Sequence, residues 1–259
     1  MNKAEFYKSL RRRNSGVFGT SLSQRQVEGI EGILSAFNQV GDGKDSTLAY
    51  ALATAYHEVG GRMVPVREGF ASTDAGARRA VNNLARKRGP NSAVARYAQP
   101  QPPYGYVYYG RGHVQLTWLD NYRESSADAG VDLVKNPDAM LDAKTSARVM
   151  INGLLDGRWN AGGHGIRHYL DQGDMRGARR TVNITDKWEL IAGYHRAFLA
   201  AIKAGGGVAA KRLDPVTPIL PTPADVPDTP VVTRPTPNSQ TQSWFVRLIA
   251  AFFNSFRKG

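Results

Sequence analysis

The chain has 259 residues, a net charge of +12 and no cysteine. This length suffices for one large domain with a hydrophobic core. The lack of cysteine excludes disulfides, thiolate metal sites and cysteine nucleophiles, and it fits synthesis in a reducing cytoplasm. The positive charge favours a polyanionic partner, such as nucleic acid, an anionic membrane face or an acidic wall polymer, without choosing among them.

The N-terminal residues 1–14 carry positive charge, but no apolar run of signal-peptide length follows them. No stretch of the sequence approaches the ~20 apolar residues that a membrane-spanning helix needs. We therefore expect synthesis in the bacterial cytoplasm without a signal peptide.

Helical periodicity dominates the first 205 residues. Ser23 is expected to cap a helix that runs to about Gln39, and Asp45 or Ser46 is expected to cap the next helix. The other expected helices cover residues 74–88, 118–129, 137–155 and 186–203.

Aromatic and β-branched residues alternate with glycines between Tyr104 and Trp118. This pattern predicts a short strand or hairpin. Together with the helices it predicts a mainly helical α+β domain with a small sheet.

The composition changes sharply after residue 207. Residues 208–242 are rich in proline and threonine, which favours an extended linker. Residues 243–259 combine aromatic residues with arginine and lysine and contain no acid, which predicts a short cationic amphipathic helix. Such a helix could lie on an anionic membrane surface or pack back onto the main domain, which is expected over residues 1–207.

Two glutamates stand out in the main domain. Glu58 lies at the end of an alanine-rich helix and borders its apolar stripe, so burial and the helix dipole should raise its pKa, as a general acid requires. Glu68 lies in a glycine-flanked loop, where a carboxylate can stay ionised. Two carboxylates in unlike environments can break a glycosidic bond. The alternative is ordinary surface charge, which is the commoner origin of such a pair.

Three features of the sequence are similar to glycoside hydrolase family 19, the chitinase-like fold that many phage endolysins share. Residues 55–61 read AYHEVGG, Glu68 follows at the family's offset for the second acid, and residues 108–118 read YYGRGHVQLTW. A weaker match covers residues 178–186. The resemblance implies a lysozyme-like, two-lobed helical domain whose small sheet or hairpin lines a cleft.

The resemblance also implies roles for individual residues. Glu58 would be the general acid, Glu68 the general base, and Thr117 would help to hold the attacking water in a single displacement with inversion. Substrate-cleft positions are implied for Gln115, Asn121, Tyr109, Arg111 and Asn183. At residue 184 the chain has isoleucine where the family has glycine, and no arginine aligns with the family's C-terminal cleft arginine.

No cofactor or metal is expected, because the sequence has no phosphate-binding loop or dinucleotide fingerprint. His57, next to Glu58, has no companion residues at zinc spacing, so we expect it to be a hydrogen-bonded structural histidine.

The resemblance and the charge together lead us to expect a peptidoglycan-degrading endolysin, a lysozyme-like muramidase that hydrolyses β-1,4 bonds. We expect a monomer without a specific nucleic-acid partner. It would reach the periplasmic cell wall after release from the cytoplasm through a holin. The alternatives are a chitinase and a non-catalytic protein that binds wall glycan or nucleic acid.

Overall fold

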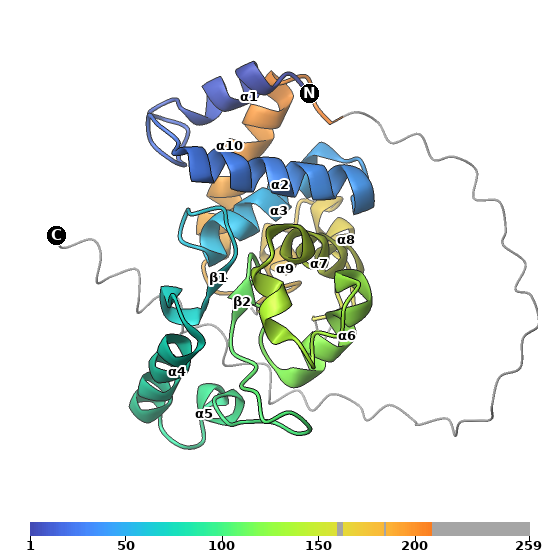
Figure 1. Cartoon of the computed structure of the whole chain (residues 1–259). Coiled ribbons are helices and arrows are strands. Elements are labelled where there is room, and N and C mark those ends of the chain that lie inside the picture. The colour runs from blue at the N-terminus through green and yellow to red at the C-terminus, as the bar shows by residue number, and fades with distance from the viewer. Residues whose placement is uncertain (160–162, 184, 209–259) are drawn as a thin grey trace, which may run out of the picture.

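The structure is a computed structural model and describes residues 1–159, 163–183 and 185–208. Over these ranges it is mainly helical, with one two-stranded sheet, as the sequence predicts (Figure 1). The elements in chain order are α1 (Lys3–Leu10), α2 (Gln24–Val40), α3 (Asp45–Glu58), β1 (Val66–Arg67), η1 (Glu68–Phe70), α4 (Asp74–Arg88), α5 (Ala93–Tyr97), β2 (Arg111–Gly112), α6 (Leu119–Ala129), η2 (Pro137–Leu141), α7 (Ala143–Asp156), α8 (Ile166–Leu170), α9 (Met175–Arg179) and α10 (Trp188–Ala204).

The larger of two hydrophobic cores surrounds α3 (Figure 1). This helix is buried along almost its whole length, because its run of alanines lets α10 and its other neighbours approach closely. The buried position of α3 carries its last residue, Glu58, into the interior.

The smaller core lies between α4, α5 and the segment that leads into β2. It contains Ala77, Val81, Val94 and Tyr97. We call residues 71–107, which include both helices, the small lobe. In Figure 1 it projects from the rest of the domain, beyond the sheet. The two separate cores agree with the expected two-lobed shape.

The sheet pairs β1 with β2 in antiparallel register, Val66 opposite Gly112 and Arg67 opposite Arg111. The expected hairpin over residues 104–118 is therefore only partly correct, because the strand in this segment finds its partner in β1. Isolated bridges still fold the segment back on itself, for example between Arg111 and Leu116.

Several predicted helix bounds are correct. Ser23 caps α2 and forms a capping box with Gln26, and α4 covers the expected residues. One prediction is wrong, because residues 137–155 do not form one helix. Asp142 accepts a hydrogen bond from the backbone of Thr145, which starts α7 anew after the 3₁₀ turn η2.

Two other helix starts differ from the prediction. Asp45 is the first residue of α3 and does not cap it, and its carboxylate instead accepts a hydrogen bond from the backbone N–H of Val208 at 2.8 Å. Helix α10 begins at Trp188, because Lys187 adopts a left-handed conformation with φ of 58°.

The expected linker and C-terminal helix lie outside the described residues, apart from Val208. Among the helices that the structure does describe, none has the length and apolar character to cross a membrane.

Candidate active site

Glu58 ends α3 and is 4% exposed. Its Oε1 lies 2.8 Å from Nη1 of Arg179, and both side chains of this ion pair are buried. Burial raises the pKa of Glu58, and the Arg179 guanidinium opposes that rise. The expected raised pKa is confirmed in direction, and it favours the protonated form that a general acid needs.

Arg179 is a residue of the candidate site that the sequence does not predict. It ends α9, far from Glu58 in the chain, and its Nε donates to the backbone oxygen of Asp186 at 3.1 Å. That hydrogen bond aims the guanidinium at Glu58. The only signal in the sequence was an arginine in the weakly matching stretch over residues 178–186.

Glu68 follows β1 and is held by residues of the small lobe and of the segment before β2. Its Oε1 accepts from the hydroxyl of Tyr97 at 2.8 Å, and its Oε2 accepts from the backbone N–H of Gly110 at 2.9 Å. Burial raises the pKa of Glu68, while these two donors and Arg111 oppose the rise. Glu68 is therefore less like a free loop carboxylate than the sequence suggested, although its donors favour the ionised form.

The Tyr97 hydroxyl gives this site a specific pH prediction. Tyr97→Phe removes a donor that stabilises the Glu68 carboxylate, so the pKa of Glu68 should rise further. If Glu68 must be ionised to act, the acidic limb of the kcat/KM profile moves to higher pH. Tyr108→Phe is the matched control, because the Tyr108 hydroxyl donates to the backbone of Val134 instead. An unchanged acidic limb in Tyr97→Phe would argue against Glu68 as the base.

The loop after β2 contains Gln115 and Thr117. Gln115 has φ of 51°, and its Nε2 donates to the backbone oxygens of Val66 and Gly112, both at 3.1 Å. The Thr117 hydroxyl is buried and donates to the backbone oxygen of Gln115 at 2.9 Å. Gln115 thus fixes the two strands together, and Thr117 keeps acceptor capacity for a water. Their roles toward substrate and water stay predictions.

Tyr109 and Arg111 are almost fully buried, and their side chains support the site from within the fold. The Tyr109 hydroxyl donates to Asp74 at 2.8 Å, and the Arg111 guanidinium lies 3.6 Å from the Tyr109 ring centroid. Arg111 also donates to Asp138 at 2.8 Å and to the Tyr122 hydroxyl at 3.1 Å. These contacts fix the course of the segment that presents Gly110 to Glu68.

Of the remaining predicted site residues, Asn121 contacts Thr117 and Asn183 contacts Arg179. Asn121 is in the first turn of α6, where its Nδ2 donates to the backbone oxygen of Thr117 at 2.8 Å. Asn183 follows α9, and its backbone N–H donates to the oxygen of Arg179 at 2.9 Å. His57 is buried, and burial together with Arg179 lowers its pKa to about 3, so it is neutral.

Known proteins resemble a part of the chain that includes Glu58 and Glu68. The glycoside hydrolase family 19 model, described as chitinase class I, matches residues 30–152. The chain carries a glycoside hydrolase family 19 chitinase domain. The matched region contains Glu58, Glu68 and Thr117, whereas Arg179 and Asn183 lie beyond it.

Among curated proteins, the chain is 46% identical over 50 residues to endochitinase 1 of Theobroma cacao, covering 18% of this chain and 16% of that protein. It is 33% identical over 88 residues to inactive chitinase-like protein 1 of Hevea brasiliensis, covering 27% and 28%. The matches thus span less than a third of either relative.

Solved structures give a distant likeness. Chitinase C of Streptomyces griseus HUT6037 is similar with a TM-score of 0.47 and 18% identity, covering 81% of this chain and 78% of that one. A bacterial family 19 chitinase gives a TM-score of 0.46 and 22% identity, covering 80% and 95%.

Proposed function

We propose that the chain hydrolyses β-1,4 bonds in glycans built on N-acetylglucosamine, with Glu58 as general acid and Glu68 as general base. The observation that carries this proposal is the pair of glutamates in unlike surroundings: Glu58 is buried against Arg179, and the partly buried Glu68 accepts from Tyr97 and Gly110. Two related proteins are named inactive, so activity itself is part of the proposal. The presence of both carboxylates supports catalysis over a binding role alone.

The acid step follows from the environment of Glu58. In its protonated form Glu58 gives its proton to the glycosidic oxygen as the bond to the leaving sugar breaks. The carboxylate that results is buried, and the Arg179 guanidinium stabilises it. Arg179 is therefore a positioning residue that lowers the free energy of the ionised acid after proton transfer.

The base step follows from the environment of Glu68. Its carboxylate takes a proton from a water, whose oxygen attacks the anomeric carbon from the face opposite the leaving group. The hydroxyl of Tyr97 and the N–H of Gly110 hold this carboxylate in place. Thr117 is proposed to orient the water. A single displacement of this kind converts a β-linked sugar into the α-anomer.

Two glycans fit this chemistry. The names of the relatives support chitin, and they favour it over peptidoglycan. The net charge of +12 supports peptidoglycan, whose stem peptides carry carboxylates. With peptidoglycan as substrate, the protein would act as an endolysin that reaches the wall after release from the cytoplasm.

Parallel digests test the proposal. Chitohexaose and purified peptidoglycan are incubated with the protein, and the products are analysed by mass spectrometry and, for the oligosaccharide, by proton NMR within the first turnovers. New reducing ends are expected on at least one glycan, with the α-anomer formed first from chitohexaose if it is cleaved. Their position in peptidoglycan would show whether the bond after muramic acid or after glucosamine is cut. No new reducing ends on either glycan would refute the proposal.

A further inference from the structure

The positive charge of the protein is concentrated in the small lobe. Residues 71–107 contain six basic residues and one acid, which gives a net charge of +5. The described residues outside this lobe carry a net charge of only about +4, although they are more than four times as many. The lobe is therefore the most cationic part of the described structure.

This charge faces solvent. Every basic residue of the small lobe is exposed, whereas Ala77 and Val81 place the opposite side of α4 in the core. Arg79 and Arg86 are seven residues apart, or two helical turns, so they lie in line on the outer face of α4. The acid of the lobe, Asp74, accepts from the Tyr109 hydroxyl and from Arg111 and lies 4.0 Å from Arg78, so it pairs with Arg78 and leaves Arg79 and Arg86 unneutralised.

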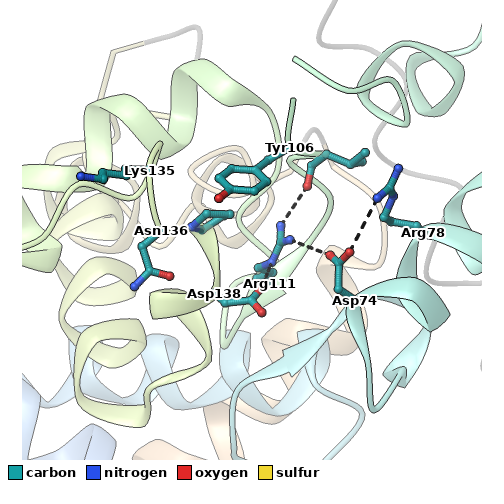
Figure 2. Close-up of a pocket in the computed structure, with 9 residues that line it drawn as sticks. Asp74, Arg78, Tyr106, Arg111, Lys135, Asn136 and Asp138 are labelled. Atoms are coloured by element: carbon teal, nitrogen blue, oxygen red, sulfur yellow. Dashed lines mark hydrogen bonds and ion pairs between the residues drawn. The ribbon is translucent and has the colours of Figure 1, made fainter. Parts of the chain in front are cut away.

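Two exposed tyrosines lie on the same lobe, and one of them, Tyr106, lines a pocket together with the cation Arg78. Tyr104 and Tyr106 are 45% and 42% exposed, and their rings stack with centroids 5.9 Å apart and an angle of 29°. Tyr106 also lines an open pocket, which Figure 2 shows between Asp74 on one side and Asn136 on the other. Exposed, stacked aromatic faces are suited to the apolar faces of sugar rings.

The pocket and the proposed base Glu68 lie on opposite sides of the backbone at residues 67 and 68. Neighbouring residues of an extended strand point to opposite faces. Arg67 accordingly reaches Asp138 in the pocket wall at 2.7 Å, whereas Glu68 turns to Tyr97 and Gly110. The small lobe nevertheless supplies Tyr97 to Glu68, so a polymer bound on its surface would lie near the proposed base without occupying its site.

We propose that the small lobe is an anchoring surface for acidic glycan strands. The guanidinium groups on the outer face of α4 bind carboxylates of the strand, and Tyr104 and Tyr106 stack on its sugar rings. This inference rests on the peptidoglycan candidate of the proposed function. A glycan is favoured over nucleic acid because the surface adjoins the groups that would cut a glycan.

The test is the binding of Glu58→Gln protein to insoluble purified peptidoglycan, measured by sedimentation at near-physiological salt. Adding Arg79→Glu and Arg86→Glu should weaken binding about tenfold or more, which corresponds to the loss of about 1.4 kcal/mol. Adding Tyr104→Ala should weaken it about threefold to tenfold, as the loss of one aromatic contact predicts. Should the double charge variant fail to fold, Arg79→Glu alone carries the test with about a threefold loss.

The matched control reverses two exposed charges elsewhere, Arg25→Glu with Lys203→Glu, for the same change in net charge. It should weaken binding less than about threefold, because screening confines charge effects to ~8 Å at physiological salt. Equal losses in both double variants, or no loss in the α4 variant, would overturn the proposal. So would a loss confined to duplex DNA, assayed in parallel. Because this assay needs no turnover, inactivity in the digests would refute the proposed function and leave the anchoring result standing.

Discussion

Glu58→Gln is expected to lower the rate of glycan hydrolysis by about 10²–10⁴-fold, the usual contribution of a general acid. The amide has nearly the same shape as the acid but cannot deliver a proton to the leaving oxygen. Initial rates on the cleaved glycan, measured by the release of reducing ends, give the effect. Glu68→Gln should also be severely impaired, because the attacking water loses its base, whereas Thr117→Val should be milder.

The control for this prediction is Glu124→Gln, at an exposed position on α6. It should change the rate less than about twofold, as expected for an exposed surface position. A Glu58→Gln protein that hydrolyses the glycan at a near wild-type rate would remove Glu58 from the mechanism. A Thr117→Val protein with less activity than Glu68→Gln would reverse the ranking of these residues.

Arg179→Met is expected to destabilise the folded protein by about 3–5 kcal/mol at neutral pH, the usual result of leaving one charge of a buried pair alone. The substitution removes the group that opposes the rise in the pKa of Glu58, so that pKa rises further. A carboxyl whose pKa is raised by folding makes the native state bind more protons, so the loss grows as pH rises through the raised pKa and is smallest in acid. Chemical denaturation at several pH values measures this dependence.

Two matched variants separate charge from packing at this position. Arg180→Met changes the neighbouring, exposed arginine and should cost less than about 0.5 kcal/mol. Glu58→Gln combined with Arg179→Met removes the unpaired carboxylate and should recover part of the stability. A loss in Arg179→Met that does not vary with pH, and that the double variant does not reduce, would show that the arginine contributes packing only.

Local signals in the sequence predict much of the helical part of the fold. Ser23, followed three residues later by Gln26, marks the start of α2, and α4 has the bounds that the sequence predicts, between its cap Thr73 and Gly89. The break at Asp142 was missed because the apolar pattern runs on through it, while the cap that decides it is a single side chain. The pairing of β1 with β2 depends on contacts between distant segments, which local periodicity cannot show.

In the candidate site, too, local sequence predicts some features, whereas others depend on contacts between distant segments. Burial of Glu58 could be predicted, because the alanines of its own helix make α3 a buried helix. Its partner Arg179 could not, because the pairing depends on how α9 packs near the end of α3. The internal bonds of Arg111 were also not predictable, since a motif arginine can equally be exposed or buried, and here Asp138 and Tyr122 hold it almost fully buried at the wall of the pocket.

The division of labour between Glu58 and Glu68 is tested most directly by changing the leaving group. Chitooligosaccharides of one length are prepared with a sugar or with a nitrophenyl group at the scissile bond, and both Gln variants are assayed on each. A nitrophenolate leaves without being protonated, so Glu58→Gln should recover at least about tenfold of its lost rate on the aryl substrate, within the range that acid catalysis contributes. Glu68→Gln should recover little, because its water still lacks a base. Equal recovery in both variants, or recovery in Glu68→Gln alone, would contradict the assignment of acid and base.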